Sequence, residues 1–190
     1  MTQKNELRAE LRKQRRGHVA ALPDAISALI FARPPAPLLN LIPENSVVGL
    51  YFNTPDEAPT AAYTRFFHEE GRAVALPRFA NKSAPMEFAV LSDPYDYDDC
   101  EVGPFGMLQP SGEASAVIPS VVFVPLLGFT ERGDRLGQGG GHYDRYLSAH
   151  PHLIAIGMGW DLQLCDTLPV ESHDIRLDAV VTPTRLYGPL

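Results

Sequence analysis

The chain has 190 residues, of which 45% are hydrophobic and 21% charged, enough for one globular domain with its own core. Its formal net charge of −7 argues against nucleic-acid binding, and no apolar run approaches the roughly 18–20 residues of a membrane span. The basic start lacks the apolar core of a secretory signal, and Cys100 and Cys165 form no metal-ligand pair. We therefore expect a cytoplasmic monomer with reduced thiols, a single domain over residues 1–190, and neither nucleic-acid nor membrane partners.

Residues 1–16 form a basic segment that predicts a helix. They carry six basic and two acidic side chains, a net charge of +4, so the remaining chain carries −11. Leu7 and Leu11 lie one turn apart and are expected to dock the helix on the protein, and Gly17 is expected to end it. Basic side chains recur every four residues and form a stripe, which consists of Lys4, Arg8, Arg12 and Arg16. A second helix is predicted over residues 22–32, before the prolines of residues 33–37.

Short apolar runs then alternate with helical segments. The runs that predict strands cover residues 46–52, 73–77, 86–91, 121–125, 153–159 and 177–182. Helices are predicted over residues 61–71, with Thr60 as the cap and Gly71 at the end, and over residues 143–150. Strands alternating with helices indicate an α/β fold, a mostly parallel open sheet with helices on both faces in three Rossmann-like layers.

Residues 92–120 have turn-forming residues throughout and no clean hydrophobic period. We expect a long irregular connection with one short strand near its middle. Connections of this kind are often lids or mobile functional segments.

The stretch RLGQGGGHYDR, residues 135–145, follows the predicted strand 121–125, where ligands bind in open parallel sheets. Glycines allow positive φ angles and close approach to the backbone amides, which form a concave site for anions. Arg135 and Arg145 supply forked donors for phosphate oxygens. The carboxylate of Asp144 is suited to bind a magnesium ion, which would bridge to the phosphate. The stretch matches neither the Walker pattern nor the Rossmann GxGxxG pattern. Residue chemistry alone leaves two interpretations: a phosphate cradle or an ordinary glycine turn with a surface arginine.

The segment VPLLGFTERGDRLGQGGGHYDRYL, residues 124–147, resembles the signature of the 5-formyltetrahydrofolate cyclo-ligase family, also called methenyltetrahydrofolate synthetase. KNELR near the start, YFNTPDEAPT, VALPR and MEF in the middle and LPVESHDIRLDAVVT near the end also match, in the same order. The resemblance implies that the protein converts 5-formyltetrahydrofolate into 5,10-methenyltetrahydrofolate with ATP as co-substrate and magnesium as cofactor. The implied route phosphorylates the formyl oxygen to an iminium phosphate, after which a folate nitrogen closes the ring.

The resemblance also assigns roles to individual residues. Arg135 and Tyr143 are the implied catalytic residues, and Asp144 and Asp174 the implied magnesium ligands. Phe52 would cover the pterin ring, while Glu57 would accept hydrogen bonds from the pterin N–H groups. The implied ATP-binding residues are Lys4, Arg8, Arg135, Leu136, Gly137, Gln138, Gly139, Gly140, Gly141, His142, Tyr143 and Arg145. The residues implied to face the formyl end of the folate are Gln138, Gly139, Gly140, Gly141 and His142.

The chain departs from the family pattern at four positions, namely Thr130, Gln138, His142 and Gln109. His142 and Thr130 bear on the geometry near the transferred phosphate. Two other hypotheses therefore stay open beside the cyclo-ligase. One is a non-catalytic folate or nucleotide binder that has lost turnover. The other is a different enzyme on a similar sheet, such as a sugar-phosphate isomerase or a CoA transferase, which ATP dependence distinguishes.

Overall fold

The computed structural model describes residues 3–23, 26 and 29–188. The helices, in chain order, are α1 (Gln3–Ala21), α3 (Ala36–Leu39), α4 (Ala61–Glu69), α5 (His142–Ala149) and the 3-10 helix η1 (Asp161–Gln163). Within this described part of the chain, no helix is both long enough and apolar enough to cross a membrane.

Eight strands form one sheet in the order β12-β11-β10-β7-β1-β2-β3-β6. Their bounds are β1 (Val48–Gly49), β2 (Val74–Arg78), β3 (Glu87–Val90), β6 (Ala116–Val117), β7 (Val121–Pro125), β10 (Ile154–Met158), β11 (Ala179–Val181) and β12 (Leu186–Tyr187). Two small antiparallel pairs lie outside this sheet, β4 (Cys100–Val102) with β5 (Leu108–Pro110), and β8 (Gly128–Phe129) with β9 (Arg135–Leu136).

The central strands β11, β10, β7, β1 and β2 run parallel, which confirms the mostly parallel sheet. The outer strands β12, β3 and β6 pair antiparallel with their neighbours. Residues 79–86 connect β2 to β3 without a helix, and a connection without a crossover element returns the chain antiparallel.

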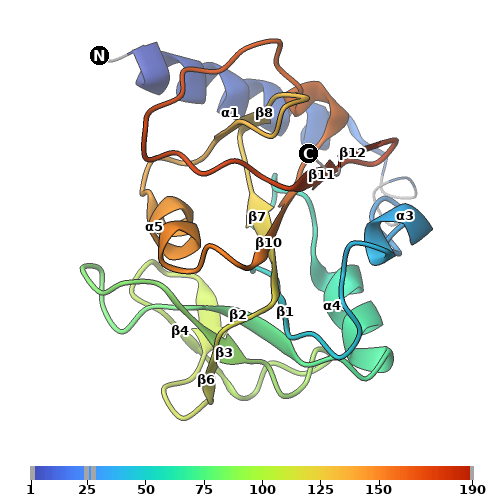
Figure 1. Ribbon diagram of the computed structural model, residues 1–190, viewed down its shortest axis with the longest axis vertical. Helices are drawn as coiled ribbons and strands as arrows, with labels where there is room; N and C mark the ends of the chain where they lie inside the picture. The colour runs from blue at the N-terminus through green and yellow to red at the C-terminus, as the bar shows by residue number, and fades with distance from the viewer. Residues whose placement is uncertain (1–2, 24–25, 27–28, 189–190) are drawn as a thin grey trace.

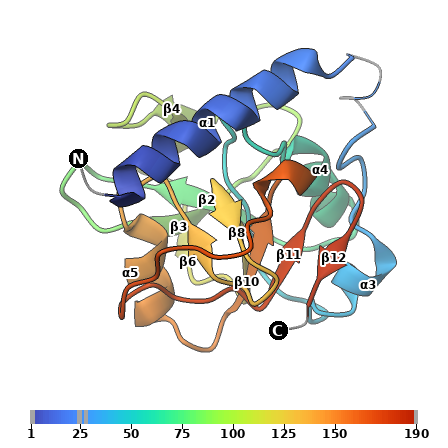
Figure 2. The same ribbon diagram turned by 90° about the horizontal axis from the view of Figure 1, so that it is seen from above.

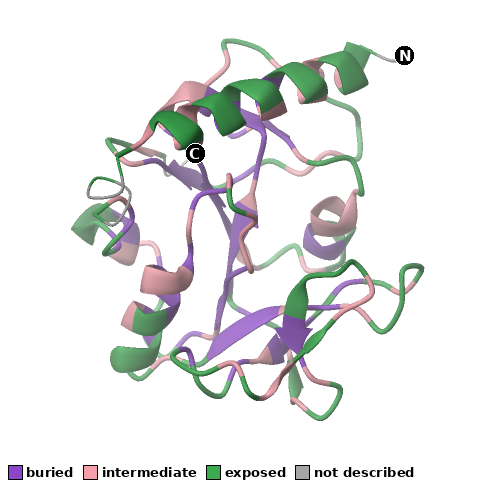
Figure 3. Cartoon of the chain, turned by 180° about the vertical axis from the view of Figure 1, so that it is seen from behind, coloured by how far each residue is buried: buried purple, intermediate pink, exposed green. Residues whose placement is uncertain are grey.

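Helices cover both faces of the sheet, as predicted (Figure 1). In β7, Val121 and Phe123 pack in the core cluster that contains side chains of α3 and α4. Val122 and Val124 point the other way, into the cluster that contains side chains of α5. Because both faces are covered, the central strands are buried along their length (Figure 3), and they read as continuous apolar runs.

Helix α1 lies across the end of the sheet rather than on either face (Figure 2). Leu11 is buried against Leu127 and Leu136, with Leu7 beside them, so the predicted docking pair is confirmed. The prediction that Gly17 ends the helix is wrong, because α1 continues to Ala21. Glycine inside a helix costs only about 1 kcal/mol. Contacts beyond it offset that cost, including the edge-to-face packing of His18 on Trp160 at 5.3 Å between ring centroids.

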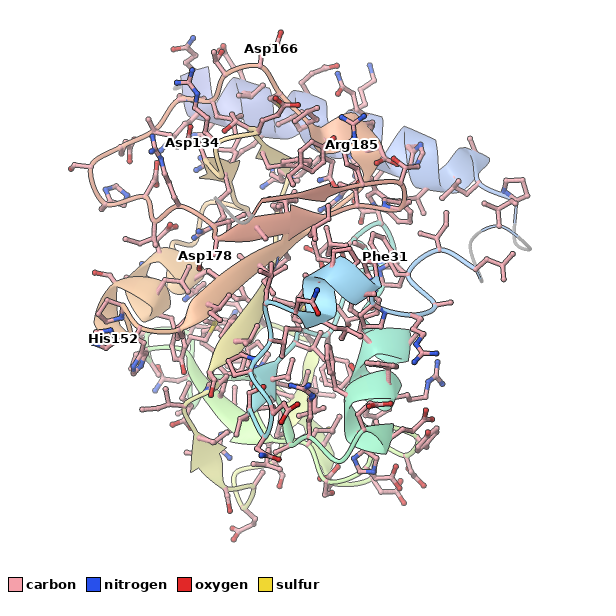
Figure 4. The ribbon with its side chains drawn as sticks, turned by 45° about the vertical axis from the view of Figure 1, so that its right-hand side comes forward. Phe31, Asp134, His152, Asp166, Asp178 and Arg185 are labelled. Atoms are coloured by element: carbon pink, nitrogen blue, oxygen red, sulfur yellow. The ribbon has the colours of Figure 1, made fainter. Side chains whose placement is uncertain are left out.

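The predicted helix over residues 22–32 falls partly outside the described residues, at 24–25 and 27–28. Of its described residues, Phe31 packs edge-to-face on Tyr63 and Trp160 and is labelled in Figure 4. The prediction for residues 61–71 holds better, since α4 spans Ala61–Glu69 and Gly71 has a positive φ of 75°. The Thr60 side chain does not cap α4, however, because its hydroxyl donates to the carbonyl of Tyr51.

Residues 92–120 contain three short strands, whereas the sequence predicted one. They contain β4 and β5, which pair with each other, and β6, which pairs with β3 and forms one edge of the sheet. Each of these strands has only two or three residues. A strand that short cannot show an alternating pattern, so the sequence does not reveal it.

Both cysteines are free thiols, and the pKa of each is raised. Burial and the neighbouring Asp99 raise the pKa of Cys100 to about 11. Because the thiolate is the reactive form, we expect iodoacetamide at pH 8 to alkylate Cys100 about a hundredfold more slowly in the folded protein than in guanidinium. Peptide mass spectrometry over time measures both rates, and equal rates would contradict this environment for Cys100.

The order in which strands are added to the sheet reverses between β1 and β7. After β1 the strands β2, β3 and β6 are added on one side, whereas β7 pairs with the other side of β1 and β10, β11 and β12 follow outward. The connections that leave β1 and β7 therefore diverge and leave a crevice beyond the carboxyl ends of these strands. Ligands bind at such switch points in open α/β sheets.

Candidate active site

A cavity of about 1040 Å³ occupies this crevice. Six segments supply most of its lining: the basic face of α1, the loop after β1, the residue after β2, the tip of the β4–β5 hairpin, the glycine stretch 135–144 and residues 169–174. Volumes of roughly 300–1,000 Å³ are typical of small-molecule sites. The cavity is therefore large enough for a sizeable ligand or for two substrates together.

The glycine stretch adopts the positive φ angles that its composition allows. Gly139 and Gly141 have φ values of 107° and 63°, in the region that disfavours side chains. Gly141 is also the N-cap residue of α5, so the first amides and the positive dipole end of this helix lie beside the stretch. Arg145 donates to the carbonyl of Gly140 at 2.9 Å, which holds the turn in place.

Helix α1 holds the glycine stretch from above. Arg8 donates to the carbonyl of Gly137 at 3.1 Å. Arg12 donates to the side chain and to the carbonyl of Gln138, both at 2.9 Å. The basic stripe therefore faces the cavity, and its side chains position the loop as well as contributing positive charge.

Arg135 is buried and lies between a carboxylate and a carbonyl. Its guanidinium donates to Oδ1 of Asp144 at 2.6 Å and to the carbonyl of Ile175 at 2.8 Å. Burial lowers the pKa of Arg135, while the charges of Asp144 and Asp174 oppose that shift. An ordinary arginine pKa lies so far above neutrality that the group stays cationic.

Lys4 and Asp174 form a second ion pair at the cavity, with 2.9 Å between the ammonium nitrogen and Oδ2. Partial burial alone would raise the pKa of Asp174. The hydrogen bonds from Lys4 and from the amide of Glu171, together with the charges of Lys4 and His173, outweigh burial and lower it. Oxygen and nitrogen ligand atoms of Glu171, His173 and Asp174 lie within 4.8 Å of one another, and Asp144 is not part of that group.

Glu57 contributes a buried carboxylate to the cavity, next to the glycine stretch. Its Oε2 accepts from the amide of Thr54 at 2.8 Å, and its Oε1 accepts from the side chain of Gln138 at 3.3 Å. Phe52, three residues after β1, packs its ring against Tyr97 at 5.2 Å between centroids. Burial, followed by the charge of Glu57, raises the pKa of Tyr143 far above its ordinary value, so this phenol is neutral at physiological pH.

Arg15 is a buried cavity residue that the sequence does not single out from the other basic residues of α1. Its Nε and one terminal nitrogen lie 2.9 and 2.8 Å from Oδ2 of Asp56, and its other terminal nitrogen donates to the carbonyl of Leu126. Trp160 donates to the carbonyl of Asp56 at 3.1 Å. These bonds join α1 to the loops after β1 and β7.

We expect Arg15→Ala to lower the free energy of unfolding by about 3 kcal/mol, because it removes a buried guanidinium together with its bonds to the half-buried Asp56 carboxylate and to the Leu126 carbonyl. Urea denaturation measures this change. Lys13→Ala, on the exposed side of the same helix, is the control and is expected to change stability by less than about 0.5 kcal/mol. Equal effects of the two substitutions would contradict the proposed role of the pair.

Aromatic rings from three segments form one wall of the cavity. Phe79 follows β2, Phe105 lies at the tip of the β4–β5 hairpin, and His142 begins α5. The ring centroids of Phe79 lie 5.0 Å from Phe105 and 4.9 Å from His142. The sequence analysis did not predict Phe79 or Phe105 as site residues. Phe79 follows a predicted strand, and this position could have indicated that it lies at the site.

The structure places Thr130 in the turn between β8 and β9 rather than in the cavity wall. Thr130 is buried and is not among the residues that line the cavity. Its hydroxyl accepts from the amides of Arg132 and Asp134 in the turn between β8 and β9. Asp134, labelled in Figure 4, also accepts from Arg176 at 2.8 Å, so this departure from the family pattern serves the turn.

The cavity brings together nearly all of the residues that the sequence predicts for the site. Those that line it are Lys4, Arg8, Phe52, Glu57, Asp174 and residues 135–144. Arg145, the last residue of the predicted stretch, is exposed and is not in the lining.

Comparison with known proteins identifies relatives along the whole chain. The model of the 5-formyltetrahydrofolate cyclo-ligase family matches residues 1–183. The 5-formyltetrahydrofolate cyclo-ligase of Haemophilus influenzae is 30% identical over 149 residues, which cover 73% of this chain and 78% of the relative. The 5-formyltetrahydrofolate cyclo-ligase of Escherichia coli K12 is 42% identical over 85 residues. This match covers 42% of this chain and about half, 47%, of the relative.

Solved structures share the fold. The NMR structure of Aquifex aeolicus 5,10-methenyltetrahydrofolate synthetase has a TM-score of 0.77 at 24% identity and covers 99% of this chain and 93% of its own. A Mycoplasma pneumoniae 5,10-methenyltetrahydrofolate synthetase has a TM-score of 0.69 at 20% identity, covering 94% and 98%. Fold, ordered motifs and the family match agree, and the chain belongs to the 5-formyltetrahydrofolate cyclo-ligase family.

Proposed function

We propose that this protein converts 5-formyltetrahydrofolate into 5,10-methenyltetrahydrofolate, using ATP and magnesium and releasing ADP and phosphate. The observation that carries the proposal is the single cavity in which the cationic glycine stretch and the Phe52–Glu57 region face the same space. A reaction between a nucleotide and a folate requires both ligands to be held together, and this cavity has the volume and the two kinds of lining to do so.

The phosphate side of the site supplies charge and fixed donors. The glycine amides and the first turn of α5 hold phosphate oxygens, and Arg135 stabilises the charge that develops as the γ-phosphoryl group moves to the formyl oxygen. In the free protein Arg135 is paired with Asp144 and Lys4 with Asp174. These pairs keep the cations positioned inside the cavity before the nucleotide arrives.

The donor set fits magnesium. Asp144 and Asp174 both line the cavity and present carboxylate oxygens, the ligands that this hard cation prefers. The bonds that Asp144 accepts from Arg135 and from the amide of Ile175 both use Oδ1. When bound, magnesium would neutralise charge on the phosphates of ATP, and these two residues would hold it.

The folate side orients the second reactant. Glu57 accepts hydrogen bonds from the pterin N–H groups, and Phe52 packs on the ring. Transfer of the γ-phosphoryl group makes the formyl oxygen a good leaving group. The N10 nitrogen then attacks the formyl carbon, phosphate leaves with that oxygen, and N10 loses its proton. Because ring closure is intramolecular, alignment of the reactants is the main contribution of the protein.

The test is the rise in near-ultraviolet absorbance that accompanies formation of methenyltetrahydrofolate by the purified protein. We expect the rise only when ATP, magnesium and 5-formyltetrahydrofolate are all present, and each is omitted in turn as a control. Calorimetric binding of both ligands without product would instead indicate a non-catalytic binder. Turnover without ATP would indicate a different class of enzyme.

A further inference from the structure

We propose that Gln109 is a positioning residue that holds the Phe79–Phe105 wall of the cavity in place for the folate substrate. Its carboxamide pairs with both backbone groups of one residue. The amide of Phe79 donates to Oε1 at 3.0 Å, and Nε2 donates to the carbonyl of Phe79 at 3.1 Å. The buried Gln109 side chain therefore satisfies the backbone N–H and C=O of Phe79, as a neighbouring strand would, just beyond the end of β2.

The same side chain also holds the β4–β5 hairpin. Its Nε2 contacts Oε1 of Glu101 at 3.2 Å. The backbone of Gly103 lies directly on the carboxamide, since a Cβ at Gly103 would lie 2.3 Å from Oε1 of Gln109. Any side chain at this position would therefore displace Gln109, so the fit between the hairpin and the amide depends on glycine.

The hairpin tip is a tight turn that presents Phe105 to the cavity. Gly103 donates to the carbonyl of Met107 at 2.8 Å, and Gly106, with a φ of 78°, donates to the carbonyl of Gly103 at 2.9 Å. Phe105 then reaches the rings of Phe79 and His142. Gln109 thus joins the hairpin to the sheet at the point where the aromatic wall begins.

The position of the wall in the sheet indicates which substrate it serves. Phe79 follows β2, and β2 pairs in parallel with β1, the strand that precedes Phe52 and Glu57. The carboxyl ends of parallel neighbours meet at one edge, so the wall continues the folate side of the cavity. This inference rests on the proposed function, since it takes 5-formyltetrahydrofolate as the ligand.

The chain offers a matched control in Gln163. It is also a buried glutamine whose carboxamide pairs with backbone, donating to the carbonyls of Leu126 and Leu127 and accepting from the amide of Trp160. It does not line the cavity. Gln109→Met and Gln163→Met each keep the side-chain volume and remove three hydrogen bonds. A purely structural role would therefore give the two variants the same kinetic signature.

The decisive measurement is steady-state kinetics of both variants with each substrate varied. We expect Gln109→Met to raise the KM for 5-formyltetrahydrofolate about tenfold while the KM for ATP changes less than about twofold. Gln163→Met should leave both values near wild type. An unchanged folate KM in Gln109→Met, or an equal rise in Gln163→Met, would overturn the proposal.

A conservative pair and a ligand-free readout complete the test. In Gln109→Glu the new carboxylate meets the Glu101 carboxylate and cannot donate to the Phe79 carbonyl, so the folate KM should rise. Adding Glu101→Gln should recover part of the loss.

Hydrogen exchange of residues 79–80 and 103–107 should be faster in Gln109→Met than in Gln163→Met, and equal exchange would refute the anchoring. If the wild-type protein shows no turnover, the proposed function fails, whereas the exchange result still decides the anchoring.

Discussion

Arg135→Ala is expected to lower kcat/KM for the ATP-dependent reaction by about a thousandfold. Arg135 is buried, and its fork joins Asp144 to the carbonyl of Ile175 inside the cavity. Removing it takes away a buried positive charge from the proposed phosphate side of the cavity. It also leaves Asp144 without its partner, which adds negative charge where phosphate must bind.

Two further variants separate charge from geometry at this position. Arg135→Lys keeps the charge but loses the fork, so we expect a loss between that of the alanine variant and wild type. Arg132→Ala removes an exposed arginine of the same loop and should keep full activity. Thermal melts show whether each variant is folded. A folded Arg135→Ala protein with activity within about threefold of wild type would remove Arg135 from the mechanism.

Glu57→Gln is expected to raise the KM for 5-formyltetrahydrofolate about a hundredfold and to leave the KM for ATP nearly unchanged. The carboxylate accepts at both oxygens, from Thr54 and from Gln138. An amide turns one acceptor into a donor, which then faces either the Thr54 amide or the Gln138 side chain, and the pterin N–H groups lose part of their acceptor. Either arrangement leaves polar groups in the cavity unpaired.

Glu131→Gln is the matched control, because it makes the same change at an exposed position of the β8–β9 turn and should alter neither KM. Isothermal titration with 5-formyltetrahydrofolate gives the same comparison without turnover. If Glu57→Gln raised the KM values for ATP and folate equally, Glu57 would belong to the shared structure of the cavity rather than to the folate side.

Arg15 and Gln109 show why part of this site could not be read from the chain. Arg15 is one of several basic residues on α1, and only its burial against Asp56 distinguishes it. Gln109 lies in a segment without a hydrophobic period, and its partner Phe79 is distant in sequence. Local patterns report the environment of a residue within a turn or strand, whereas both of these roles depend on contacts between distant segments.

Other features were determined by the sequence alone. The buried strand β7 was predicted with its observed bounds, because a strand covered on both faces must be apolar at every position. The glycines of the 135–145 stretch indicated a backbone with positive φ angles, and Gly139 and Gly141 adopt them. The ordered motifs were enough to indicate the family.

The tertiary structure decided how these parts meet. It carried α1 past Gly17 through the contact of His18 with Trp160, and it paired the short strands β4, β5 and β6. It also placed Thr130 in the β8–β9 turn, outside the cavity lining. For α1 and for the pairing of β6 with β3, the deciding energy comes from contacts between segments far apart in the chain, which a local pattern does not contain.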